Sequence, residues 1–276
     1  MGHGAHTMVA PAYFAAMNQK HAPASALITG ASSGIGLELA RIFAHNGFNL
    51  VLVARNRAKL LEIAADMAGI SVNVIAKDLA HPRAPQEVFD ELQEKSIPVD
   101  VLINNAGFGQ HGKFAETALE TDLEMIELNI VALTALTKLF LPAMVARGSG
   151  KIMNVASTAA FQPGPLMAVY YASKAFVLSF SEAIANELNG SGVSVTCLCP
   201  GATETNFAQR AQMTNSLLFK MGAMDAKTVA QIGYEGLMKG KTLVIPGAKN
   251  KVLAQSLRIS PRKLVTAISR RIQEQR

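Results

Sequence analysis

The chain has 276 residues, half of them apolar, a length that suits one large α/β domain or two small ones. Tryptophan is absent and aromatic residues make up only 6%, which disfavours a surface that stacks bases, so we expect no nucleic-acid partner. The net charge of +6 comes from residues 249–276, which hold eight basic residues and one acid (+7), so residues 1–248 sum to −1.

In chain order, residues 1–22 have no basic segment followed by an apolar core, so we expect a disordered or tag-like leader. Residues 23–248 are predicted to form one domain, and residues 249–276 a basic tail. Valine-rich, isoleucine-rich and leucine-rich runs alternate with helical patterns, which predicts an α/β fold with a Rossmann-type, doubly wound parallel sheet. Strands are predicted at 25–30, 48–55, 70–78, 99–107, 150–157, 192–201 and 241–247, and helices at 34–47, 56–67, 84–95, 121–146 and 168–189.

The stretch TGASSGIG (29–36) joins the first predicted strand to the first helix. Gly30, Gly34 and Gly36 would allow a tight turn and the close approach of a pyrophosphate to the helix N-terminus, where free amides favour negative charge. The spacing differs from G-x-G-x-x-G, and no G-K-[ST] follows as in a Walker loop. An ordinary glycine-rich turn is the alternative.

The second predicted strand ends at Ala54 and Arg55, where an enzyme that selects NAD usually carries an acid. A basic residue there would accommodate a 2′-phosphate, which predicts NADP(H) in preference to NAD(H); alternatively, Arg55 merely starts a helix. Asp78, after the third strand, is placed to meet an adenine amino group, and Asn105 in the turn 104–107 would line the adenosine side.

Two adjacent tyrosines, Tyr170 and Tyr171, precede Lys174 on one predicted helix. Residues at i, i+3 and i, i+4 are both neighbours on a helix, so spacing alone leaves open which tyrosine contacts the lysine. Earlier in the chain, the apolar run 129–146 is interrupted by Lys138 and Pro142 and predicts a buried helix rather than a membrane span. Cys197 and Cys199 predict reduced, buried thiols in a cytoplasmic protein, with no metal site.

The segments TGASSGIG, NNAG, NVAS, YYASK and CPG occur in an order and at intervals that resemble the short-chain dehydrogenase/reductase family, in its compact single-domain branch, over residues 24–247. The resemblance implies that Tyr170 is a general acid/base, that Lys174 supports it and holds the nicotinamide ribose, and that Ser157 donates to the substrate oxygen. It also implies that Asn129 holds a water connecting the lysine to solvent. A nearby ammonium together with an oxidised nicotinamide would lower the pKa of Tyr170.

The predicted catalytic set is therefore Asn129, Ser157, Tyr170 and Lys174. The predicted cofactor-binding set comprises the glycine turn, the ends of the following strands and the loop after the sixth strand: Gly30, Ser32, Ser33, Gly34, Ile35, Gly36, Arg55, Asp78, Leu79, Asn105, Ala106, Gly107, Tyr170, Lys174, Pro200, Gly201, Thr203 and Thr205. The predicted substrate-binding set is Ser157, Phe161, Met167, Tyr170 and Phe207.

In this family a segment such as 206–224, rich in Met, Leu and Phe, is a lid over an apolar substrate; alternatively, it packs on the body or on a partner subunit. His111 is expected to be a loop histidine near the rim of the pocket. The tail is longer than in the commonest members, and Pro261 would separate two short helices with basic residues between apolar ones. It could lie on an anionic membrane, cover the pocket or dimerise.

The sequence thus predicts an NADP(H)-dependent oxidoreductase for a small-molecule carbonyl or alcohol with an apolar body. A 3-oxoacyl-carrier-protein-type reductase and a catalytically inactive dinucleotide-sensing protein are the alternatives. A homodimer or homotetramer is expected from the family resemblance alone.

Overall fold

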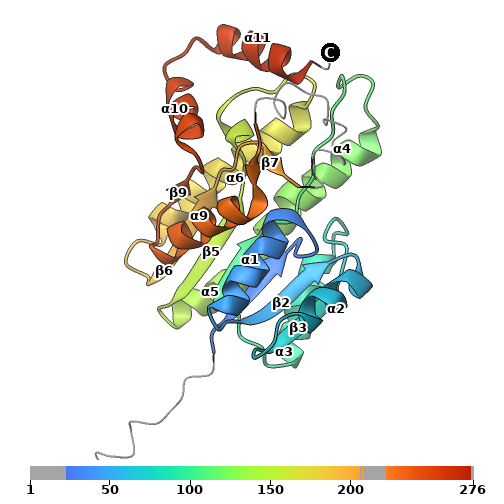
Figure 1. The fold of residues 1–276 in the computed structure, drawn as a ribbon, viewed down its shortest axis with the longest axis vertical. Helices are drawn as coiled ribbons and strands as arrows, with labels where there is room; N and C mark the ends of the chain where they lie inside the picture. Colours follow the sequence, from blue (N-terminus) through green and yellow to red (C-terminus); the bar gives the residue numbers. More distant parts are fainter. Residues whose placement is uncertain (1–22, 206, 208–221, 275–276) are drawn as a thin grey trace, which may run out of the picture.

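The computed structural model describes residues 23–205, 207 and 222–274, which are built around a seven-stranded parallel sheet (Figure 1). The strand order β3-β2-β1-β4-β5-β6-β9 takes the chain outward to one edge, back to the middle and on to the other edge. This order confirms the predicted doubly wound α/β fold. The strands are β1 (Ser25–Thr29), β2 (Asn49–Ala54), β3 (Val72–Ala76), β4 (Val101–Asn104), β5 (Gly150–Val155), β6 (Val193–Leu198) and β9 (Leu243–Val244).

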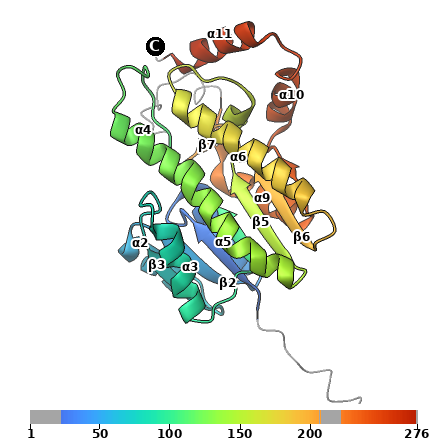
Figure 2. The same ribbon diagram turned by 180° about the vertical axis from the view of Figure 1, so that it is seen from behind.

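Helices cover both faces of the sheet, as the two opposite views show (Figures 1 and 2). One face carries α1 (Gly34–His45), α2 (Arg57–Ala65) and α9 (Ala226–Met238). The other face carries α3 (Ala84–Glu94), α5 (Leu133–Ala146) and α6 (Ala168–Glu187). Both faces of the strands are therefore buried, which explains their continuous apolar sequences.

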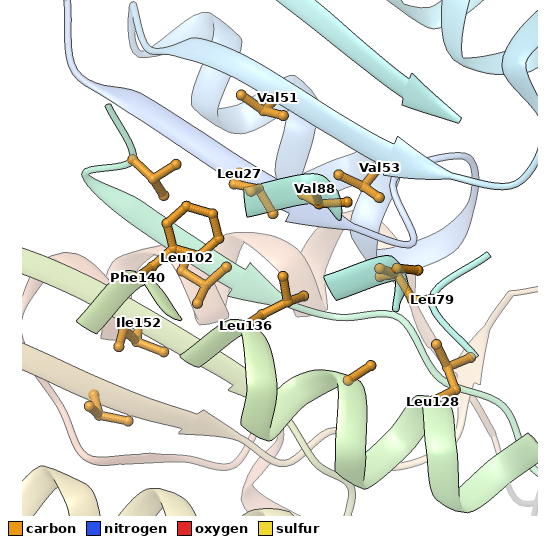
Figure 3. Close-up of a cluster of buried hydrophobic side chains, with 14 of the residues drawn as sticks. Leu27, Val51, Val53, Leu79, Val88, Leu102, Leu128, Leu136, Phe140 and Ile152 are labelled. Atoms are coloured by element: carbon orange, nitrogen blue, oxygen red, sulfur yellow. The ribbon is translucent and has the colours of Figure 1, made fainter. Parts of the chain in front are cut away.

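The larger core cluster lies between the sheet and the helices on the face that carries α5 (Figure 3). Leu27 and Leu102 of adjacent strands lie near Leu136 and Phe140 of α5, and all four side chains are at most 4% exposed. Burying a leucine or phenylalanine side chain contributes about 1.5–3 kcal/mol. This packing fixes the central strands, whose carboxyl ends carry the polar residues described below.

Helix ends follow local signals in the sequence. The Asn56 side chain accepts a hydrogen bond from the Lys59 amide at 3.0 Å and so caps α2. Helix α1 ends at His45, and Gly47 reverses the chain with a φ of +78° that favours glycine. The helix α9, the two-residue strands β7 (Thr203–Glu204) and β8 (Met224–Asp225), and the 3-10 turn η2 (Thr158–Phe161) were not predicted.

The predicted long helix is three consecutive elements: α4 (Leu119–Ile126), the π-helical turn η1 (Glu127–Ala132) and α5. Among the described residues, this continuous helix over Leu119–Ala146 is the one long and apolar enough to cross a membrane. Leu128, Leu136 and Phe140 nevertheless enter the core cluster, in agreement with the predicted buried helix. The π-helical turn was not anticipated.

The basic tail forms α10 (Ala248–Ser256) and α11 (Arg262–Gln273), separated at Pro261 as predicted. In both views the two helices extend over one end of the molecule, beyond the carboxyl ends of β5 and β6 (Figures 1 and 2). The tail therefore lies at the end of the sheet where doubly wound folds bind ligands.

Candidate active site

A cavity of about 480 Å³ lies along the carboxyl ends of the strands. One end is formed by the glycine turn after β1 and by the residues after β2 and β3. The middle is formed by the segments after β4, β5 and β6 together with α6, and residues of the tail helices close the other end. Its position is that of the ligand crevice in doubly wound sheets.

The glycine turn brings the N-terminus of α1 to the cavity, which Gly34 and Ile35 line. Ser33 occupies the N-cap position without a side-chain capping bond, and the first turn of α1 carries no acidic residue. The first amide groups are therefore available to an anion, and the helix dipole favours negative charge there. This arrangement fits the pyrophosphate of a dinucleotide.

Glycine is required within the turn because the chain passes close to itself. Gly30 and Gly34 have φ values of +66° and +56°. A Cβ built on Gly36 would lie 2.4 Å from Asn105 Nδ2 and 2.4 Å from the Gly30 carbonyl oxygen. Asn105 Nδ2 donates to the Thr29 carbonyl at 2.9 Å, and the Asn105 amide donates to Thr29 Oγ1 at 3.0 Å. Asn105 thus holds the turn against the segment after β4, a structural role that the sequence did not indicate.

Arg55 follows β2 and lines the end of the cavity that the glycine turn forms. Its guanidinium lies 3.7 Å from Asp78 and 3.9 Å from Glu124, and its side chain is about half exposed. Asp78 also accepts a hydrogen bond from the Ala80 amide at 3.1 Å. The carboxylate predicted to meet an adenine amino group therefore also orients Arg55, a pairing that we did not anticipate.

Ser157, Tyr170 and Lys174 converge in the middle of the cavity. Ser157 follows β5 and caps η2, where its Oγ accepts a hydrogen bond from the Ala159 amide at 3.1 Å. Tyr170 and Lys174 are one helical turn apart on α6, and Lys174 Nζ lies 5.8 Å from the centroid of the Tyr170 ring. The Tyr170 side chain also hydrogen-bonds to Ser157. The two hydroxyl groups are therefore hydrogen-bonded to each other, and the ammonium group lies over the tyrosine ring.

Burial controls the protonation of this trio. It raises the pKa of Tyr170, and the hydrogen bond from Ser157 only partly opposes this. Burial also lowers the pKa of Lys174 from its ordinary value near 10.5 to about 8. Lys174 Nζ donates to the Val155 carbonyl at 2.8 Å. The lowering of the Tyr170 pKa expected from Lys174 together with an oxidised nicotinamide stays a prediction, because desolvation is the largest influence on the phenol here. The phenol stays protonated at neutral pH.

Asn129 lies in the π-helical turn η1 and is 1% exposed. Its Oδ1 accepts from the Phe108 amide at 3.1 Å, and its Nδ2 donates to the Phe108 carbonyl and to Ser173 Oγ, both at 3.0 Å. π-Helical turns occur frequently at functional sites. Here the turn places Asn129 between the segment after β4 and helix α6. Its predicted role in holding a water stays a prediction.

The cavity brings together most of the predicted residues. Gly36, Asn129 and Phe161 do not line it. Gly36 lies against Asn105, and Asn129 is hydrogen-bonded to Phe108. Phe161 packs against the cluster that contains Ala160 and Val177. The segment predicted as a lid, including Leu217, Leu218 and Phe219, lies outside the described residues except for Phe207 and residues 222–224. The predicted residues that line the cavity are Gly30, Ser32, Ser33, Gly34, Ile35, Arg55, Asp78, Leu79, Asn105, Ala106, Gly107, Ser157, Met167, Tyr170, Lys174, Pro200, Gly201, Thr203, Thr205 and Phe207.

The tail supplies lining residues that the sequence analysis did not identify. Of the three roles considered for the tail, covering the pocket agrees with these lining residues, and the membrane and dimer roles stay predictions. His111, expected at the rim, contacts the Gln273 carbonyl through Nε2 at 2.9 Å. Tyr171, the second tyrosine of the pair, also lines the cavity. The unpredicted lining residues of the tail are Asn250, Leu253, Ser269, Ile272 and Gln273.

Comparisons with known proteins agree with this geometry. The profile of the family described as short chain dehydrogenase matches residues 24–216. The ketoacyl reductase HetN of Nostoc sp. is 36% identical over 79% of this chain and 77% of its own. A short-chain dehydrogenase from Sphingobium yanoikuyae, solved in complex with NADPH, has a TM-score of 0.76 and 34% identity over 87% of this chain and 97% of its own. A bulky-bulky ketone specific alcohol dehydrogenase from Comamonas testosteroni has a TM-score of 0.74 and 32% identity over 86% and 93%.

Proposed function

Because the chain belongs to the short-chain dehydrogenase/reductase family, we propose that it transfers hydride between NADP(H) and a carbonyl or secondary alcohol of an apolar substrate. Family membership makes it an oxidoreductase that acts on carbonyl or CH–OH groups with a nicotinamide dinucleotide. The observation that carries the proposal is the convergence of Ser157, Tyr170 and Lys174 in the cavity that also receives the N-terminus of α1.

The proposed chemistry follows from the protonation states. When bound, the nicotinamide supplies hydride to the carbonyl carbon or accepts it in the reverse direction. Tyr170, held protonated by its buried position, donates its phenolic proton to the carbonyl oxygen. Ser157 donates a hydrogen bond to the same oxygen and stabilises its developing charge. Lys174, whose pKa is about 8, is mostly charged at neutral pH and supports the phenolate that remains.

The proposed preference for NADP(H) rests on Arg55. Its guanidinium lies after β2, where a 2′-phosphate would be recognised, and Lys77 also lines this end of the cavity. A fluorescence titration with NADPH and NADH would test this preference on wild type and Arg55→Ala. We expect wild type to prefer NADPH and the variant to lose about tenfold of that preference, roughly one charge-assisted hydrogen bond.

Arg41→Ala is the matched control, because Arg41 is exposed and pairs with Glu38 on the surface of α1. An unchanged ratio of NADPH to NADH affinity in Arg55→Ala would contradict the assignment of Arg55 to the phosphate.

The apolar substrate is proposed from the walls beside Tyr170. Met167 and Phe207 line the cavity there, and the centroid of the Phe207 ring lies 5.2 Å from that of Tyr170. NADPH oxidation would be followed over a panel of ketones and aldehydes of increasing apolar size. We expect kcat/KM to rise with apolar surface, and higher values for small polar ketones would overturn this part of the proposal.

A second candidate function is the reduction of 3-oxoacyl thioesters, because the relative from Nostoc is a ketoacyl reductase. The basic tail could then face an acidic carrier protein. Comparing kcat/KM for a 3-oxoacyl thioester and a simple ketone of equal chain length would test this candidate. A ketone that reacts as fast as the thioester would exclude it.

We also propose that the protein is a cytoplasmic homodimer or homotetramer, on the basis of the family resemblance. We propose in addition that the tail makes a peripheral contact with anionic membranes. Leu264 and Ile268 are 56% and 51% exposed on α11, beside the exposed Lys263 and Arg271. Light scattering would measure the assembly, and a monomer would contradict it. Equal sedimentation with anionic and neutral vesicles would contradict the membrane contact.

A further inference from the structure

One stripe of α11 faces the protein. Val265, Ser269 and Gln273 recur every four residues along it and are 6%, 2% and 1% exposed. Residues at this spacing share one face of a helix. Two of the three side chains are polar, although an apolar residue would pack against the body at less cost. Ser269 and Gln273 both line the cavity. The stripe therefore places polar groups at the tail end of the cavity.

Gln273 is anchored on two sides. Its Nε2 donates a hydrogen bond to the hydroxyl of Tyr171, and its backbone carbonyl contacts His111 Nε2 at 2.9 Å. The remaining atom, Oε1, is buried and has no hydrogen-bond partner among the described residues. A buried acceptor without a partner destabilises the folded protein. The side chain is thus fixed with one hydrogen-bonding position unused, in a residue that belongs to the lining of the cavity.

This polar group lies close to the proposed reaction centre. The rings of Tyr170 and Tyr171 have centroids 6.0 Å apart, and both line the cavity. If the carbonyl of a substrate contacts Tyr170 and Ser157, the part of the substrate beside the carbonyl would therefore contact Tyr171 and Gln273.

The described residues of the tail that line the cavity are uncharged, and so are Gln162 and Met167, which also line it. Of the described cations that line the cavity, Arg55 and Lys77 follow β2 and β3, and the Lys174 ammonium is directed to the Val155 carbonyl. A carboxylate or phosphate would lose its hydration here without gaining a counter-charge.

We infer that Tyr171, Ser269 and Gln273 form a polar subsite that binds a neutral hydroxyl or amide group on the body of the substrate. The inference rests on the proposed function and narrows its substrate class to apolar carbonyl compounds that carry one uncharged hydrogen-bonding group. A hydroxyl group suits the subsite because it can donate to Gln273 Oε1 and accept in return. The C-terminal helix, through Gln273, is then a determinant of specificity.

The test uses the full chain with NADPH and three series of methyl ketones of increasing length. The chains end in a methyl, a hydroxyl or a carboxylate group, so that different lengths sample the distance from the carbonyl to the subsite. At the best length we expect kcat/KM to be about ten- to a hundredfold higher for the hydroxyl than for the methyl compound. Gln273→Leu should abolish this difference mainly through KM, while NADPH affinity stays unchanged.

Arg271→Leu is the matched control, because Arg271 is exposed on the same helix and should leave the preference intact. Tyr171→Phe serves as a second variant if Gln273→Leu does not fold, and it should reduce the same preference. Equal kcat/KM for hydroxyl and methyl ketones in wild type, or a preference for carboxylates, would overturn the subsite while leaving carbonyl reduction intact. If wild type reduces no ketone in any series, the proposed function fails and the subsite fails with it.

Discussion

Replacing Lys174 with methionine should change how the stability of the protein depends on pH. Lys174 is buried, and burial lowers the pKa of its ammonium group from 10.5 to about 8. At 1.36 kcal/mol for each pKa unit, the charged form costs the folded state about 3 kcal/mol. Methionine has a similar length and no charge, so the variant does not carry this cost.

The sign follows from proton binding. Between pH 8 and 10.5 the unfolded chain binds the lysine proton and the folded chain releases it, so the free energy of unfolding of wild type rises with pH. The cost is fully present below pH 8 and is gone above pH 10.5. Between pH 7 and 10, the stability of Lys174→Met relative to wild type should therefore fall by roughly 2–3 kcal/mol. The lost hydrogen bond to Val155 adds an offset that does not vary with pH.

The measurement is urea denaturation of the cofactor-free protein, followed by circular dichroism, at several values from pH 7 to pH 10. Lys241→Met, at an exposed lysine, is the matched control and should give a curve parallel to that of wild type. If the curves of Lys174→Met and wild type were parallel as well, the ammonium group would not be desolvated, and this account of the site would be refuted.

Two further variants, Gly36→Ala with its control and Asn154→Leu, test residues that support the structure around the site. Gly36→Ala introduces a Cβ that would lie 2.4 Å from two neighbouring atoms, so NADPH affinity should fall at least about tenfold. Gly47→Ala, beyond the other end of α1, meets nothing within 4 Å and should cost only about 1–2 kcal/mol of stability, with unchanged affinity; equal affinity losses would refute the turn argument. Asn154→Leu removes a buried side chain that donates to Ser181 Oγ at 2.9 Å, so urea denaturation should show a loss of about 1–3 kcal/mol. A stability change below about 0.5 kcal/mol would show that this bond contributes little.

The sequence was most informative where short motifs encode both local geometry and topology. The glycine turn 29–36 is typical of the connection between a strand and a helix, and parallel strands bring their carboxyl ends to one edge. That is why residues as distant in sequence as Gly34 and Arg55 could be assigned to one edge of the sheet. The family resemblance added Tyr170, and all three line one cavity.

The sequence was less informative where packing decides the outcome. A helical pattern does not show the register change at Glu127–Ala132, because the π-helical turn leaves the apolar sequence continuous. Phe161 looked like a substrate contact, but η2 turns it toward a core cluster. The tail had the expected apolar spacing, yet Ile268 is exposed and the inner stripe ends in polar residues. Hydrophobic periodicity carries no signal for Ser269 or Gln273.

The central claim is that Tyr170 is the proton donor in a site that also binds the dinucleotide. Single-turnover oxidation of NADPH by a reactive ketone, measured with NADPH affinity, tests it directly on wild type, Tyr170→Phe and the control Tyr234→Phe. We predict that Tyr170→Phe loses at least about a hundredfold in rate, the usual size of a general acid's contribution, while its NADPH affinity stays within about twofold. A Tyr170→Phe variant that reduces the ketone as fast as Tyr234→Phe would contradict the claim.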